Sequence, residues 1–185
     1  MTQSTRREFL KSTITATAAT ATCGVHSSAA DERRPSLAGE IGFTTGSLAY
    51  QRRNKLLKMS SLPKFVRDDL GMQLIDLNTN WLESYEDSYV RRVRESAEDA
   101  DCFFTNLKVN HKFGDLYADD TNERQKAMAH ARQLVTAARL LGARWMRFSI
   151  PKPVPDTRTA TLSAHRELAR VAESQGIQLL VENNG

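Results

Sequence analysis

Short apolar runs alternate with longer amphipathic stretches through most of this chain. The runs are residues 41–43, 74–75, 102–104, 145–146 and 177–181. They follow one another at roughly 30 to 40 residues, which is the length of one parallel strand–helix–strand unit. The stretches between them repeat apolar residues at helical spacing. The pattern therefore predicts a repeating β-α chain with five strands in parallel.

Glycine closes three of the amphipathic stretches. Gly71, Gly142 and Gly176 each stand between such a stretch and the apolar run that follows it. Many helices end on a residue in the left-handed conformation, which glycine adopts without a steric penalty. We therefore expect helices to end at these three positions.

Four helices are expected between the strands. Their windows are 62–70, 88–100, 120–141 and a fourth that opens near residue 156, after the proline-rich segment 151–155. Asp120 and Glu123 resemble a capping box at the start of the third helix. The residues expected to face the sheet are Ala127, Ala131, Leu134, Val135, Ala138 and Leu141 in the third helix, and Leu162, Leu168, Ala169 and Ala172 in the fourth.

Polar residues follow every apolar run. They are Thr44, Asp76 with Asn78, residues 106–111, Arg147 with Ser149, and Glu182 with Asn183. A ring of polar side chains at the strand ends is how a TIM barrel assembles its site. A five-stranded doubly wound open sheet is the alternative, but segment 44–48 lacks the glycine spacing of a nucleotide-binding loop. We expect an α/β fold, an incomplete TIM (β/α)8 barrel with about its first five strands and four helices.

Two segments carry a family resemblance. Residues 140–148 (LLGARWMRF) and 180–185 (LVENNG) resemble the xylose isomerase-like TIM barrel family, which contains sugar and sugar-phosphate isomerases and epimerases, with endonuclease IV as a cousin. The similarity spans residues 40–185. It implies that these residues are the N-terminal part of such a barrel, and that the family's other metal ligands belong to strands six to eight, beyond this chain.

The resemblance gives Glu182 two roles. The family's strand-five glutamate is a divalent-metal ligand and takes part in proton transfer next to the substrate carbonyl, which makes Glu182 the catalytic and metal-binding candidate. A carboxylate suits Mn²⁺ or Mg²⁺, with Zn²⁺ or Co²⁺ also possible. Because one ligand cannot hold a catalytic metal, we do not expect these five strands to retain it unaided.

Three further residues are substrate-binding candidates. His111, after the third apolar run, suits a hydrogen bond to a substrate hydroxyl or support of the metal, or is a surface loop histidine. Arg147 suits a bidentate pair with a substrate phosphate or carboxylate, or a structural ion pair in the barrel mouth. Asn183 follows Glu182 and is predicted to bind the substrate next to it.

The N-terminus matches a twin-arginine export signal. Residues 5–11 read TRREFLK, in which Arg6 and Arg7 are the paired arginines. A weakly apolar stretch follows, too short and too rich in threonine for a membrane span. We predict a signal peptide over 1–30 and a flexible leader over 31–39. The protein is then exported to the periplasm or another extracytoplasmic space, and meets the membrane only transiently.

Charge and cysteine content narrow the class. The net charge is +4, and the cations are scattered among acids, which disfavours a nucleic-acid partner. Removal of the signal leaves Cys102 as the one cysteine, so we expect a buried thiol and no intramolecular disulfide.

Together these features predict an exported, metal-dependent sugar or sugar-phosphate isomerase or epimerase that is shortened, and they leave open whether the shortened chain is an active enzyme. The alternative is a noncatalytic half-barrel that binds carbohydrate or self-associates through its open strand edges.

Overall fold

The computed structural model describes residues 37, 39–110, 116, 118, 120–150 and 158–183, all within the unit Arg34–Gly185. The predicted signal peptide, nearly all of the predicted leader, and His111 lie outside the described residues. Within the described ranges, no helix has both the length and the apolar character needed to cross a membrane.

A parallel sheet of five strands organises these residues. The strands are β1 (Gly42–Thr44), β2 (Leu74–Asn78), β3 (Phe103–Val109), β4 (Trp145–Ile150) and β5 (Gln178–Asn183). They lie in sequence order, and every neighbouring pair is parallel. A doubly wound sheet would reverse its strand order partway, so the open-sheet alternative is wrong. The predicted α/β incomplete barrel with five strands is confirmed.

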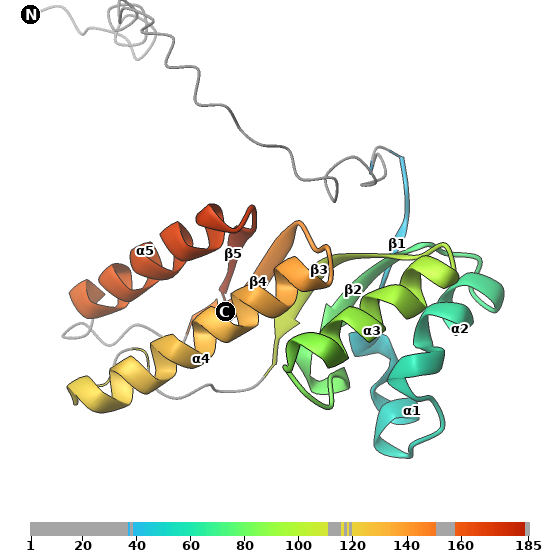
Figure 1. Cartoon of the computed structure of the whole chain (residues 1–185), viewed down its shortest axis with the longest axis horizontal. Helices are drawn as coiled ribbons and strands as arrows, with labels where there is room; N and C mark the ends of the chain where they lie inside the picture. Colours follow the sequence, from blue (N-terminus) through green and yellow to red (C-terminus); the bar gives the residue numbers. More distant parts are fainter. Residues whose placement is uncertain are drawn as a thin grey trace, which may run out of the picture. The chain divides into compact units, whose positions relative to one another are not determined.

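Helices follow the strands and cover one face of the sheet. They are α1 (Ala49–Arg53), α2 (Leu62–Asp68), α3 (Asp87–Asp99), α4 (Thr121–Leu140) and α5 (Arg158–Ser174), with 3-10 turns η1 (Thr45–Leu48), η2 (Met59–Ser61) and η3 (Thr79–Trp81). Right-handed crossovers between strands in sequence order place the helices in one layer, in which α3, α4 and α5 lie side by side (Figure 1). The four expected helices are present. The short helix α1 was not expected, because it has no buried residue and hence no apolar stripe.

Buried side chains fill the space between the helices and the sheet. Leu62, Ile75, Leu107, Leu134 and Met146 have no exposed surface. As predicted, α4 begins at Asp120, whose carboxylate accepts hydrogen bonds from the backbone N–H groups of Asn122 and Glu123. The six residues expected to face inward from this helix and its end are all buried.

The three helix-closing glycines behave as predicted. Gly71, Gly142 and Gly176 have φ of +66°, +78° and +71°. A side chain at any of these positions would be strained.

The predicted inward face of α5 is partly wrong. Leu168 and Ala172 are fully buried, but Leu162 is 47% exposed and Ala169 is exposed. Ala164 is buried in their place, because residues 164, 168 and 172 repeat at four-residue spacing on one helical face. His165 is half-buried and stacks on Phe148 with ring centroids 5.0 Å apart.

Candidate functional site

The sheet face opposite the helices carries a set of charged side chains. They are Asp76 on β2, Lys108 on β3, Arg147 on β4 and Glu182 on β5, joined by Asn106 on β3. Side chains alternate between the two faces of a strand, and the residues flanking this set, such as Leu77, Leu107 and Met146, are buried beneath the helices. Because sequential crossovers keep helices off the other face, the charged set meets none of the described helices there.

A β-bulge in β3 places Asn106 next to Asp76. The register runs from Ile75 opposite Phe104 to Asp76 opposite Asn106, so Thr105 is the extra residue. A bulge of this kind re-aims the side chains that follow it. Without it, Thr105 would stand opposite Asp76 and Asn106 would turn toward the helices.

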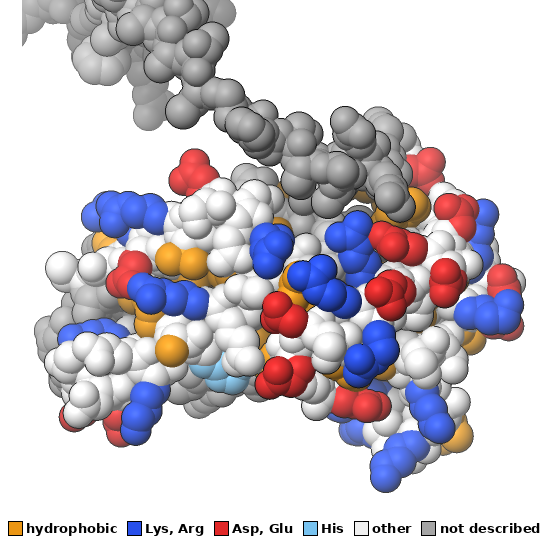
Figure 2. Space-filling model, in the orientation of Figure 1, with side chains coloured by type: hydrophobic (Ala, Val, Ile, Leu, Met, Phe, Trp, Pro, Cys, Tyr) orange, Lys and Arg blue, Asp and Glu red, His pale blue; other side chains and the backbone are white. Residues whose placement is uncertain are grey.

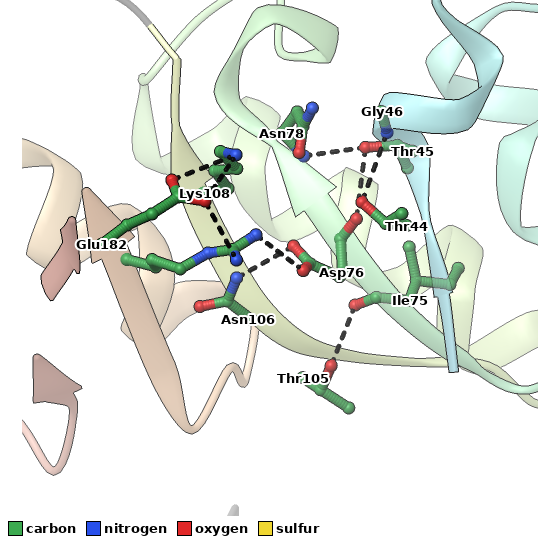
Figure 3. Close-up of polar contacts among 11 residues, drawn as sticks. Thr44, Thr45, Gly46, Ile75, Asp76, Asn78, Thr105, Asn106, Lys108 and Glu182 are labelled. Carbon is green, nitrogen blue, oxygen red and sulfur yellow. Dashed lines mark hydrogen bonds and ion pairs between the residues drawn. The ribbon is translucent and has the colours of Figure 1, made fainter. Parts of the chain in front are cut away.

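These five side chains form one continuous polar network (Figure 3). Asn106 Nδ2 donates to Asp76 Oδ1 at 2.9 Å, and Arg147 Nη2 donates to Asp76 Oδ2 at 3.2 Å. Arg147 Nη1 lies 3.5 Å from Glu182 Oε1. Lys108 Nζ lies 3.2 Å from Glu182 Oε2. The four charged side chains are between 25% and 29% exposed, so solvent screens their attraction only in part.

A second group of contacts ties the end of β1 to the end of β2. Thr45 is fully buried, and its hydroxyl donates to the backbone oxygen of Asp76 and accepts from the N–H of Asn78, at 3.2 and 2.8 Å. Gly46 lies against Asn78, since a Cβ at Gly46 would be 3.3 Å from Asn78 Nδ2. Trp81 is 5% exposed, and its indole N–H donates to the Thr45 oxygen. Trp81 is therefore a packing residue.

Three buried polar atoms near this network lack a hydrogen-bond partner within the described part of the chain: Asn78 Oδ1, Asn106 Oδ1 and Arg147 Nε. A buried polar atom left unpaired costs about 1–3 kcal/mol. Two are acceptors and one is a donor, which is the combination that hydroxyl groups can satisfy, because a hydroxyl both donates and accepts.

The structure brings two of the predicted site residues together, since Arg147 and Glu182 are ion-paired. Asn183 is the next residue of β5, in register with Ile150. Sequence reasoning noted Asp76 and Asn106 as strand-end residues without giving them a role, and it did not single out Lys108. The alternation of Asn106 and Lys108 with the buried Leu107 and Val109 was the available signal.

The described residues do not form a metal centre by themselves. Among them, no three His, Cys, Asp or Glu side chains gather closely enough to hold an ion. Asp76 lies against Arg147, and Glu182 lies against both Arg147 and Lys108. Two cationic groups therefore stand beside the carboxylates that a divalent cation would need.

No protein-family model matches the chain, and neither does any curated protein. Three solved structures illustrate its likeness to known folds, each at a low sequence identity that speaks for the fold alone. A D-psicose 3-epimerase crystallised in the presence of D-fructose is 17% identical, with a TM-score of 0.61 over 77% of this chain and 51% of its own. A sugar phosphate isomerase/epimerase from Parabacteroides distasonis is 17% identical, with a TM-score of 0.58 over 79% of this chain and 55% of its own.

A xylose isomerase-like TIM barrel protein from Mycobacterium smegmatis, in complex with magnesium, is 20% identical, with a TM-score of 0.53 over 66% of this chain and 45% of its own. This chain therefore spans about half the length of the structures that it matches.

Proposed function

We propose that this chain belongs to the xylose isomerase-like barrels and takes part in the isomerisation or epimerisation of a small sugar at the inner face of its sheet. One observation carries the proposal: the network from Asp76 to Glu182, with unpartnered buried polar atoms beside it, places Lys108 and Glu182 one residue before the carboxyl ends of β3 and β5. Barrels of this fold bind their substrates at the carboxyl ends of the strands. The likeness to sugar isomerases and epimerases supports the choice of substrate.

Glu182 is the proton-transfer group in this proposal. Its carboxylate takes the proton from the carbon next to the sugar carbonyl, and the electron pair moves to the carbonyl oxygen. Lys108, 3.2 Å from Glu182, is placed to donate a hydrogen bond to that oxygen as negative charge develops. Return of the proton to the former carbonyl carbon, while the hydroxyl proton of the first carbon moves to the former carbonyl oxygen, gives the isomer. Delivery of a proton from water to the first carbon on the face opposite Glu182, with the carbonyl re-formed, gives the epimer.

The remaining network residues hold Glu182 in place and orient the substrate. Arg147 bridges Asp76 and Glu182 and so fixes the glutamate in place. Asn78 and Asn106 offer acceptor oxygens to sugar hydroxyls. The proposal includes a divalent metal, Mn²⁺, Mg²⁺, Zn²⁺ or Co²⁺. The ligands of this metal would have to come in part from outside the described residues. The proton transfer by Glu182 is proposed without a role for the metal. Export through Arg6 and Arg7 completes the proposal.

Deuterium exchange tests the chemistry. The full chain is incubated with D-fructose in D₂O, with each metal and with EDTA, and NMR follows deuterium at the carbons next to the carbonyl. We expect exchange by the wild type and a loss of at least about 100-fold in Glu182→Gln. Glu167→Gln is the matched control, because Glu167 pairs with Arg132 at an exposed site. Absence of exchange under all conditions would contradict the proposed catalysis.

A noncatalytic half-barrel that binds carbohydrate or self-associates is the second candidate. β1 and β5 are the edge strands of the described sheet, and exposed apolar residues stand at both, Ile41 at 73% and Val181 at 50%. Apolar strand edges favour association. Saturable fructose binding without deuterium exchange, or a stable dimer in sedimentation velocity, would favour this reading.

A further inference from the structure

A groove among the helices and turns that follow β1 and β2 is lined by none of the five network residues. It has a volume of about 680 Å³ and lies among α1, η2, η3 and α3. Its walls include Arg52, Lys55, Lys58, Trp81, Tyr89 and Arg92. A volume of this size is in the range of small-molecule pockets, about 300–1,000 Å³.

Positive side chains outnumber negative ones in this groove. Four cations line it, Arg52, Lys55, Lys58 and Arg92, against one carboxylate, Glu83. The sequence has no acidic residue between Glu40 and Asp68. Figure 2 shows blue side chains over α1 at the lower right of this face, whereas blue and red are interspersed over its centre.

Several cations of the sheet and helices are paired with a carboxylate. Lys64, Arg94 and Lys108 each pair with a carboxylate. No ion pair involves any of the four groove cations within the residues that the structure describes. Like charges that converge on a hollow repel one another, so the arrangement destabilises the free protein and is relieved by an anion.

The groove also has an apolar base and hydrogen-bond donors. Its apolar base is formed by Met59, Trp81 and Val93, which are 4%, 5% and 6% exposed. Arg52 is held in place because its Nη1 donates to the Asn80 oxygen at 3.1 Å. Burial raises the pKa of the Tyr89 phenol, so Tyr89 keeps its proton as a donor at neutral pH.

Lys55 stands in a strained backbone conformation at the rim. Its φ is +55°, in the left-handed region that favours glycine or asparagine. Strain of this kind persists at ligand-binding loops more often than elsewhere. A lysine at this position adds a cation to the groove at a cost in stability.

We propose that this groove binds the phosphate ester of a small molecule, independently of the proposed sugar chemistry. Two arginines and two lysines together suit a phosphate group, and the apolar base suits the organic part that carries it. The cations line a hollow rather than a flat face, which favours a soluble ester over a lipid surface.

Titration of the full-length chain with glucose 6-phosphate tests the proposal, with glucose and inorganic phosphate as comparison probes. Calorimetry gives the affinity. In a Trp145→Phe background, the fluorescence of Trp81 reports on the groove, because Trp81 lines it. We expect saturable binding of glucose 6-phosphate that changes Trp81 fluorescence, weakens with added salt and exceeds the binding of glucose and inorganic phosphate.

Matched variants locate the site. Lys58→Gln with Arg92→Gln should raise the Kd for glucose 6-phosphate at least about tenfold. Arg53→Gln should change it less than about twofold, because Arg53 lies on α1 and does not line the groove. An equal loss in Arg53→Gln, binding of inorganic phosphate as tight as that of the ester, or binding only to phosphatidylglycerol vesicles would overturn the proposal. So would the absence of saturable binding.

Discussion

Lys108 Nζ lies 3.2 Å from Glu182 Oε2, although the two residues are separated by 74 positions in the sequence. They belong to β3 and β5, which are not neighbours, because β4 runs between them. Two strand spacings are roughly 10 Å, so two long side chains have to extend across β4 to meet. Arg147 of β4 joins them by its own contact with Glu182. The network therefore connects strands that the backbone ladder joins only indirectly.

A double-mutant cycle should detect this coupling. Lys108→Met and Glu182→Gln are made singly and together, and the free energy of unfolding is measured in urea. We expect a coupling of about 1 kcal/mol, because the side chains are only a quarter exposed. The exposed pair Arg132 and Glu167 serves as the control cycle, with an expected coupling below about 0.5 kcal/mol. Equal couplings in both cycles would show that the inner face adds nothing to the pair.

Thr45→Val should destabilise the fold. Valine has a similar shape, but it removes the hydroxyl that serves both Asp76 and Asn78 at a fully buried position. Leaving these backbone groups unpaired should lower the free energy of unfolding by about 1–3 kcal/mol.

Thr105→Val is the comparison for Thr45→Val. Thr105 is half-buried, and its hydroxyl makes one bond, to the Ile75 oxygen at 3.3 Å. We expect a loss below about 1 kcal/mol. A larger loss in Thr105→Val than in Thr45→Val would contradict the role given to Thr45.

Lys55→Gly should stabilise the protein. Glycine adopts φ +55° without the strain that a lysine has there. The free energy gained by relieving this strain exceeds the cost of the extra conformational entropy that glycine gives the unfolded chain. We therefore expect the free energy of unfolding to rise by about 0.5–1 kcal/mol. Arg53→Gly, in helix α1, should instead lower stability by about 0.5–1 kcal/mol. If Lys55 serves the groove, the stabilised variant also binds glucose 6-phosphate more weakly. Urea unfolding and calorimetry measure the two effects separately.

Cys102 should resist thiol reagents in the native protein. It is 1% exposed, and burial raises the pKa of its thiol above the ordinary value of 9.0. In a Cys23→Ser variant, which leaves one thiol, we expect Ellman's reagent at pH 8 to react at least about 100-fold more slowly than in urea. Reaction at the unfolded rate would place Cys102 at the surface.

The raised pKa of the Cys102 thiol also makes the stability of the fold depend on pH. Because the pKa is higher in the folded state, the contribution of the Cys102 thiol is fully present below about pH 9 and is lost as the pH rises through the folded value. Cys102→Ala should weaken this alkaline dependence of unfolding.

Much of the architecture was readable from local chemistry. The apolar runs, the helix windows, the Asp120 cap and the three helix-ending glycines each depend on residues close in sequence, and the structure confirms them. The exposed Leu162 and Ala169 were misplaced because periodicity leaves the exact rotation of a helix open. Helix α1 was missed because a short exposed helix has no periodic signal.

The candidate site was only partly predictable. Glu182 and Arg147 were found because each follows an apolar run in the sequence. Their mutual contact, and the contact of Glu182 with Lys108, depend on the register of three strands. The bulge at Thr105, which sets Asn106 beside Asp76, leaves no mark in the pattern of apolar residues. The cations of the groove are spread over residues 52–92 and read as an ordinary solvated surface until α1 and α3 approach each other.

Local sequence pattern was enough to specify the parallel β-α order of this chain, because hydrogen bonding and burial of neighbouring residues dictate where strands and helices form. Which charges meet was decided by tertiary structure. Sheet register brings Lys108 and Glu182 into contact, and helix packing places Arg52 and Arg92 around the same groove. Electrostatic attraction and repulsion fall off with distance, so the chemistry of the charged network and of the groove is a property of the folded chain.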